Sequence, residues 1–123
     1  MRRGEMGAEK NVELVRGGYA AFSTGDMATL NGLFAEVAVW HMAGSGVLSG
    51  PKQGRDAILA FFGELMERSN GTFTVSLLDL AGSDERVYAL QHTHAEREGK
   101  VIDRDAVNVF HISDGVALSV KLA

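Results

Sequence analysis

The chain of 123 residues contains no cysteine, which excludes disulfide bonds and thiolate chemistry and permits a reducing compartment without requiring one. Its apolar runs are far too short to span a bilayer, and its first residues show no signal-peptide pattern. The formal net charge is −4 and no basic stripe is present, which argues against a nucleic-acid partner. We therefore expect a cytoplasmic protein that binds neither membrane nor nucleic acid.

Hydrophobic residues make up 46% of the chain and charged residues 23%, which is the composition of a globular protein rather than a disordered one. This length supports one hydrophobic core without covalent cross-links. We expect a single domain over residues 11–120, preceded by a short, charged and flexible segment at residues 1–10. Residues 121–123 are interpreted as a possible vector-derived tail.

Two helices are expected near the start of the chain. Residues 11–24 carry apolar side chains at helical spacing and are followed by a glycine, which commonly ends helices. Asp26 is then suited to cap a second helix over residues 27–35. The Gly17-Gly18 pair weakens the first helix by about 1 kcal/mol per glycine relative to alanine, which suggests a close neighbour or a cavity wall at this point.

The remainder of the chain is dominated by strands. A short strand at residues 37–42 precedes a glycine-rich loop, which contains the only proline, Pro51. One broad apolar face predicts a third helix over residues 57–69. Four strands are expected at residues 72–80, 86–97, 100–112 and 116–120. The order α-α-β-α-β-β-β-β predicts an α+β fold, with the helices on one face of a curved, mostly antiparallel sheet.

The two longest strands are joined by Glu98-Gly99, a pair typical of a two-residue hairpin turn. Arg97 would then pair with Lys100. This register places His92 across from Asp105 and His94 across from Asp103, all on one face of the hairpin.

Three interpretations of this His-x-His and Asp-x-Asp pattern remain open. The one we favour is a ladder of cross-strand ion pairs at a surface or dimer interface. The second is a site for zinc or iron, which imidazole and carboxylate can ligate; we predict neither a metal nor a cofactor. The third is an acid–base pair in a cavity, which requires the register to slip by one residue. His94 and Asp105 are then the catalytic candidates.

Three segments resemble a known family: YAAFSTGDMATLNGLFA, then VWH with the following glycine-rich loop and GRDAILAFF, and ERVYALQHTHAEREGKVIDRDAVNVFHISDG. Together they resemble the SnoaL-like branch of the nuclear transport factor 2-like superfamily, which also holds ketosteroid isomerases, polyketide cyclases and limonene epoxide hydrolases. The resemblance covers roughly residues 11–120. It implies a cone-shaped α+β barrel, with three helices on the concave face of the sheet, a pocket between them, and a homodimer formed through the convex face.

The same resemblance implies which side chains face that pocket. They are Tyr19, Phe22, Trp40, Met42, Phe62, Gln91, Thr93, Asn108 and Phe110. Aromatic walls with a few amides and hydroxyls are typical of a site for a small apolar molecule that carries a carbonyl or hydroxyl group. The alternative is a filled core in which Trp40 is only the largest side chain.

Matching to the ketosteroid isomerases puts Gly18 and Met42 at the positions of the tyrosine and of the base, and Asn108 at that of the protonated aspartate. Because methionine cannot abstract a proton, the matching argues against steroid isomerisation. Asn108 can still donate a hydrogen bond to a carbonyl oxygen. We expect a small-molecule pocket protein; as an enzyme it would be a cofactor-free isomerase, cyclase or hydrolase using Asn108, Asp105 and His94. The alternative is a non-catalytic dimerisation or ligand-binding module with a vestigial pocket.

Overall fold

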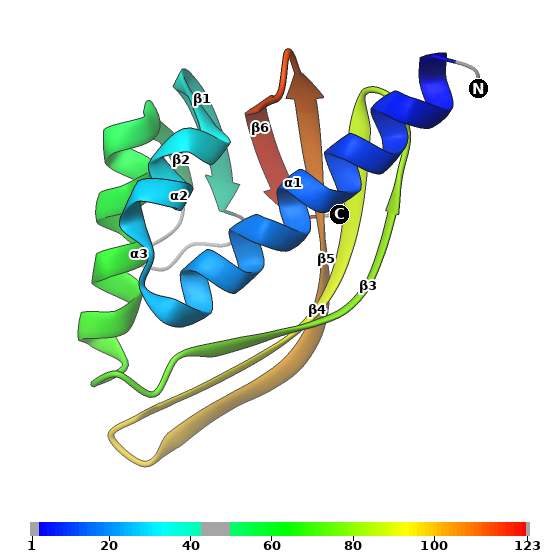
Figure 1. The fold of residues 1–123 in the computed structure, drawn as a ribbon. Helices are drawn as coiled ribbons and strands as arrows, with labels where there is room; N and C mark the ends of the chain where they lie inside the picture. The colour runs from blue at the N-terminus through cyan, green and yellow to red at the C-terminus, as the bar shows by residue number, and fades with distance from the viewer. Residues whose placement is uncertain (1–2, 43–49, 123) are drawn as a thin grey trace.

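The structure, a computed structural model, describes residues 3–42 and 50–122. It contains three helices and six strands in the described residues (Figure 1), so the predicted α+β class is confirmed. They are α1 (Arg3–Thr24), α2 (Met27–Leu33), β1 (Phe34–Met42), β2 (Gly50–Gln53), α3 (Arg55–Arg68), β3 (Thr74–Gly82), β4 (Arg86–Arg97), β5 (Lys100–Ser113) and β6 (Val116–Leu122).

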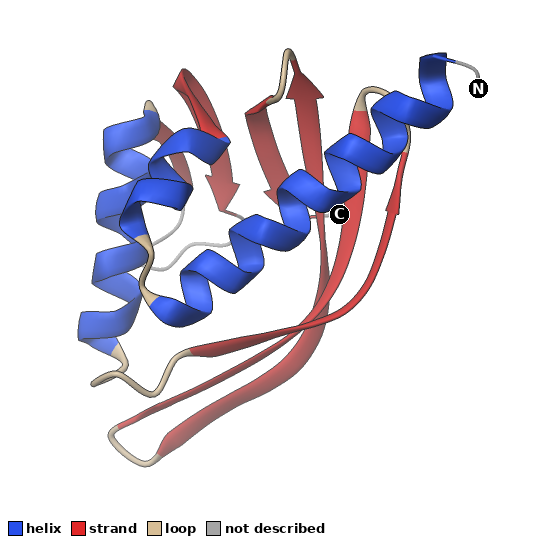
Figure 2. Ribbon diagram, in the orientation of Figure 1, coloured by secondary structure: helices blue, strands red, loops and turns tan. Residues whose placement is uncertain are grey.

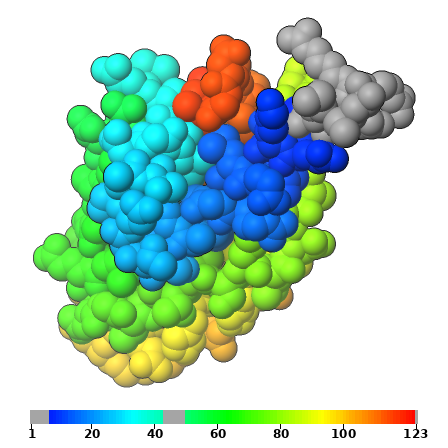
Figure 3. Space-filling model, in the orientation of Figure 1, coloured from blue at the N-terminus to red at the C-terminus, as the bar shows by residue number. Residues whose placement is uncertain are grey.

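The six strands form one sheet in the order β2-β1-β6-β5-β4-β3. All neighbouring pairs are antiparallel except β1 and β6, which are parallel. The sheet is curved, and β2 and β3 remain its two edges, so the expected barrel does not close. The three helices lie on the concave face (Figure 2), and in the space-filling view they hide most of that face (Figure 3).

The boundaries of the first elements differ from the prediction. α1 begins at Arg3, eight residues before the predicted start, so residues 3–10 are helical where a flexible segment was expected. β1 begins at Phe34, where the second helix was still expected. The edge strand β2 was not predicted. Its Pro51 is compatible with this place, because an edge strand leaves one side of its backbone without a hydrogen-bonded neighbour.

The register of the β4–β5 hairpin agrees with the prediction. Arg97 pairs with Lys100, and the pairing continues without a shift as far as Arg86 and His111. Glu98 and Gly99 both have positive φ angles, 51° and 79°, as a type I′ turn requires. Lys121 and Leu122, expected to belong to a vector-derived tail, extend β6, and Leu122 pairs with Asn108. The origin of residues 121–123 stays a prediction.

The core lies between the helices and the concave face. Its largest fully buried side chains come from five different elements: Val15, Phe34, Ile58, Val87 and Val120. Trp40 and Phe62 cross at right angles with their ring centroids 5.3 Å apart, and Phe22 meets Phe62 edge to face at 5.4 Å. Such edge-to-face contacts add to the stabilisation that burial of the rings provides.

The two adjacent glycines of α1 have different surroundings. A Cβ atom on Gly18 would lie 2.6 Å from Cδ2 of Leu33, well inside van der Waals contact, whereas a Cβ atom on Gly17 would meet nothing within 4 Å. Gly18 therefore allows α1 to approach α2 closely. The expectation of a close neighbour holds for Gly18 and not for Gly17.

We predict that the substitution Gly17→Ala raises the free energy of unfolding by about 1 kcal/mol, because alanine has the higher helix propensity and meets no obstacle. Gly18→Ala should gain clearly less than this, since the buried Leu33 side chain must move to admit the new methyl group. Urea unfolding of both variants measures the difference. Equal gains at the two positions would contradict a tight α1–α2 contact at Gly18.

Candidate ligand-binding site

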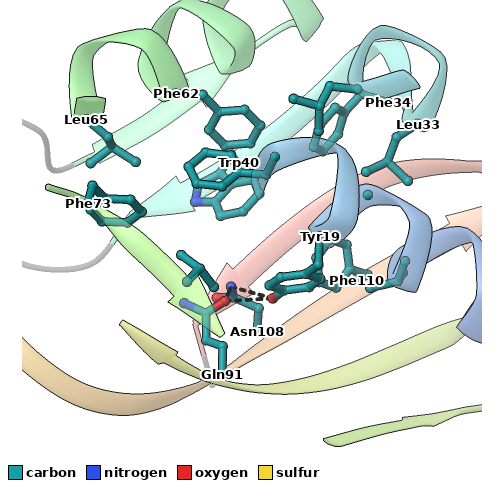
Figure 4. Close-up of a pocket in the computed structure, with 15 residues that line it drawn as sticks. Tyr19, Leu33, Phe34, Trp40, Phe62, Leu65, Phe73, Gln91, Asn108 and Phe110 are labelled. Atoms are coloured by element: carbon teal, nitrogen blue, oxygen red, sulfur yellow. Dashed lines mark hydrogen bonds between the residues drawn. The ribbon is translucent and has the colours of Figure 1, made fainter. Parts of the chain in front are cut away.

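A cavity of about 80 Å³ lies between the helices and the concave face of the sheet (Figure 4). Its wall is almost entirely apolar; besides the indole N–H of Trp40, the polar groups in it belong to Tyr19, Gln91 and Asn108. The apolar residues that line it are Val15, Gly18, Phe22, Leu30, Leu33, Phe34, Trp40, Phe62, Leu65, Phe73, Val75 and Phe110.

The volume limits what the cavity can hold without rearrangement. An apolar cavity of about 150 Å³ in another protein holds one benzene molecule, whereas a single water needs only about 10–15 Å³. At about 80 Å³, this cavity has room for a short aliphatic group rather than an aromatic ring. A larger molecule would have to extend out of it.

The three polar side chains form one hydrogen-bonded cluster, which we call the Tyr19 cluster (dashed lines in Figure 4). The Tyr19 hydroxyl donates to Oε1 of Gln91 at 2.7 Å. Nδ2 of Asn108 donates to the same Oε1 at 2.9 Å and to the Tyr19 oxygen at 3.3 Å. Nε2 of Gln91 donates to Oγ1 of Thr93 at 3.0 Å. Because this bond holds the NH2 group of the Gln91 amide toward Thr93, the carbonyl oxygen of the same amide faces Tyr19. The cluster thus joins α1 to β4 and β5.

Burial keeps the phenol of Tyr19 neutral. Loss of hydration raises its pKa to about 12, and the hydrogen bond from Asn108 acts in the opposite direction but more weakly. Tyr19 is the only ionisable side chain among the described residues of the cavity wall. At neutral pH the cluster therefore offers uncharged hydrogen-bond donors and acceptors, and none of its groups is a ready proton acceptor.

The structure brings most of the predicted pocket residues together around the cavity. Tyr19, Phe22, Trp40, Phe62, Gln91, Asn108 and Phe110 all line it. Thr93 lies just outside the wall and bonds to Gln91, whereas Met42 lies at the end of β1, paired with Gly50, and is not part of the wall. A role in ligand binding stays a prediction for each of these residues.

The two remaining catalytic candidates lie elsewhere. His94 and Asp105 are on the convex face, opposite to Gln91 and Asn108, because the β4–β5 register contains no slip. The prediction that they reach the cavity as an acid–base pair is therefore wrong for this structure. Asn108, which is only 5% exposed, is the candidate that does face the cavity.

Sequence reasoning missed part of the cavity wall. Phe73 directly precedes β3 and Val75 is its second residue, and their alternation with exposed Thr74 was a usable signal for the pocket side. Leu30 and Leu33 are spaced to lie on one apolar side of a helix, and nothing in a single sequence shows that this side borders a cavity rather than solid core. The isomerase matching placed the tyrosine position on Gly18, yet the hydroxyl of the adjacent Tyr19 reaches Asn108.

The convex face carries the predicted ladder of histidine and aspartate. His92 lies between two carboxylates: Nδ1 is 2.7 Å from Oδ1 of Asp105, and Nε2 contacts Oδ1 of Asp103. These contacts raise the pKa of His92, with the bond to Asp105 contributing most, and lower the pKa of Asp103. His94 is 3.6 Å from both Asp103 and Glu96.

Two further features are absent from residues 3–42 and 50–122. Within these ranges, no group of three or more histidine, aspartate or glutamate side chains is arranged to hold a metal ion. No helix in the same ranges is long and apolar enough to cross a membrane.

Comparison with known proteins places this geometry in context. The family model of the SnoaL-like domain matches residues 15–119. The uncharacterized protein Rv0034 of Mycobacterium tuberculosis is 37% identical over 103 residues, which cover 82% of this chain and 79% of the relative. A protein of Mycobacterium bovis, the uncharacterized protein Mb0035, shows the same identity and coverage.

Solved structures show the same fold. Bal32a, from a soil-derived mobile gene cassette, superposes with a TM-score of 0.92 at 42% identity, covering 95% of this chain and 90% of that chain. A protein of unknown function with a cystatin-like fold from Xanthomonas campestris superposes with a TM-score of 0.85 at 28% identity, covering 91% and 88%.

We predict that the free energy of unfolding decreases as the pH rises above about 6.5 and His92 loses its proton. Because its folded-state pKa is raised, protonated His92 stabilises the fold fully below the ordinary pKa of about 6.5, and the effect is lost as the pH rises through the raised value. His92→Gln should make the profile flatter, and His41→Gln, at an exposed histidine of β1, should not. Urea unfolding across this range measures the profiles; identical slopes in all three proteins would contradict the ion-pair assignment.

Proposed function

Because the chain belongs to the SnoaL-like family, we propose that it binds a small apolar molecule whose hydroxyl or carbonyl group is held by the Tyr19 cluster. The observation that carries this proposal is the cavity itself, an apolar space with one polar cluster in its wall. Such a site favours molecules that are apolar apart from one group able to hydrogen-bond. A purely apolar molecule would form no hydrogen bond with the Tyr19 cluster.

The lining residues favour binding over proton-transfer chemistry. A general acid or base needs a pKa near the working pH, and in enzymes that transfer protons it is commonly a carboxylate or an imidazole. The described part of the wall contains neither group, and its one ionisable side chain has a pKa of about 12. The sequence left open an enzyme and a non-catalytic ligand-binding module, and the composition of the described wall favours ligand binding.

A second candidate is a catalyst that polarises a carbonyl group without removing a proton itself. The observation in its favour is the adjacent hydroxyl of Tyr19 and amide of Asn108, 3.3 Å apart in the cavity wall. A pair of neutral donors of this kind can stabilise negative charge that develops on an oxygen. Turnover of a polyketide-like ketone that disappears in Tyr19→Phe would favour catalysis, and binding of the same ketone without turnover would favour the first proposal.

We predict that Asn108→Ala weakens the binding of 1-hexanol by roughly 1–3 kcal/mol, since a hydrogen-bond partner of the hydroxyl is removed. The single tryptophan, Trp40, lines the cavity, so titration of its indole N–H signal by NMR reports occupancy. Asn31→Ala removes an equivalent amide from an exposed position on α2 and serves as the matched control. Unchanged affinity in Asn108→Ala would exclude the proposed contact.

We also propose that the protein is a homodimer formed through the convex face of the sheet. None of the three helices covers this face (Figure 1). Two adjacent cross-strand pairs place apolar side chains there, Tyr88 with Val109 and Leu90 with Val107. Tyr88 is 46% exposed, so a second copy of the chain would bury substantial apolar surface at this position.

Tyr88→Glu should convert the dimer to a monomer, because a charge at this position would have to be buried without a partner. Met27→Glu is the control: Met27 is similarly exposed, at 49%, but lies at the start of α2 on the helical side. Sedimentation velocity at several concentrations measures the assembly. A monomer at every concentration in the unsubstituted protein would refute the interface.

A further inference from the structure

A polar strip leads away from the cavity along the concave face. Asn108, Ala106 and Arg104 alternate along β5 and therefore share this face. On β4, Gln91 pairs with Ala106 and Thr93 pairs with Arg104. The strip begins at buried Asn108, passes the small side chain of Ala106 and ends at exposed Arg104. Ala106 leaves space above the sheet between the two ends.

In the part of the β4–β5 hairpin nearest its turn, from Gln91 to Ala106, charge is segregated between the two faces. Arg86, at the far end of β4, lies on the convex face and outside this part. The hairpin carboxylates that belong to the strands, Glu96, Asp103 and Asp105, lie on the convex face with His92 and His94. The strand cations Arg97, Lys100 and Arg104 lie on the concave face, the side that contains the cavity. An anion that reaches this side therefore meets positive charge even though the whole chain has a net charge of −4.

Of these three cations, Arg104 is the best placed to contact a molecule in the cavity. Arg97 lines a separate surface groove with Glu64, Glu67 and Arg68, and Lys100 lies next to the hairpin turn. In the described part of the chain, Arg104 has no ion pair or side-chain hydrogen bond. Its guanidinium is thus available to an external partner, and its planar donors suit a carboxylate in particular.

We propose that the ligand is a carboxylate-bearing molecule, whose charged end binds Arg104 while its apolar chain crosses Ala106 and its hydroxyl or carbonyl group reaches the Tyr19 cluster. This inference rests on the proposed function of the cavity. The Cα atoms of residues 104 and 108 are separated by about 13 Å, four residues of extended strand. The arginine side chain spans part of this distance. A linear chain of about five methylene groups between the two polar ends fits what remains.

The test compares three molecules that share a six-carbon chain with a terminal hydroxyl group: 6-hydroxyhexanoate, its methyl ester, and 1-hexanol. Binding is followed at pH 7 by the indole N–H signal of Trp40, in the unsubstituted protein and in Arg104→Gln. Arg16→Gln is the matched control, because Arg16 is exposed on α1 and pairs with Glu13, three residues before it on the same helix. We expect the carboxylate to bind about fivefold more tightly than the ester, the order typical of an exposed charge pair, and to lose this preference in Arg104→Gln alone.

The outcomes separate this inference from the proposed function. If 1-hexanol and the ester bind but the carboxylate binds no better, the Arg104 assignment is wrong and the function of the cavity stands. If the preference persists in Arg104→Gln, another cation holds the carboxylate and the inference is likewise wrong. If none of the three molecules perturbs Trp40, the proposed function itself fails. High salt should reduce the carboxylate preference and leave the binding of 1-hexanol unchanged.

Discussion

The hydrogen-bonded contact of Tyr19 with Gln91 and Asn108 is the interaction on which the site depends. It ties α1 to β4 and β5 through side chains that lie 72 and 89 residues away from Tyr19 in the chain. Polar groups at this depth would destabilise the fold if they lacked partners, so their mutual bonds are what make a polar wall tolerable in an apolar cavity. Because the Tyr19 hydroxyl and the amides of Gln91 and Asn108 are all neutral, the site can form hydrogen bonds with a ligand but offers it no charged group. The described part of the cavity wall contains no carboxylate and no imidazole.

The β4–β5 hairpin shows how much a single sequence can establish. A two-residue turn with positive φ angles determines the register of β4 and β5, and the register determines the face of every side chain on them. The register places Asn108 and Asp105 on opposite faces of the sheet, and it thereby determines which of these candidates can face the cavity. The three-helix, curved-sheet architecture followed from periodicity and from the resemblance to a known family, and the structure confirms it.

The remaining features depend on contacts that no local pattern encodes. The β2 strand exists because β1 offers it an edge, and its Gly-Pro sequence carries no strand signal of its own. Met42 has the alternation of a pocket residue, but the cavity ends before it reaches the end of β1. A leucine on a helix, such as Leu33, borders a cavity or a solid core depending on the packing of all its neighbours. Only three-dimensional packing distinguishes these cases.

The central claim is that the Tyr19 cluster holds a polar group of a small apolar molecule inside this cavity. A crystal structure of the protein soaked in 1-hexanol tests it most directly, because it shows both the location and the orientation of the molecule. The account predicts the alcohol oxygen within hydrogen-bond distance of Tyr19 or Asn108, with the nearer part of the alkyl chain against Trp40 and Phe110 and the rest extending out of the cavity. A cavity filled by its own side chains, with the alcohol absent or bound only at the surface, would contradict it.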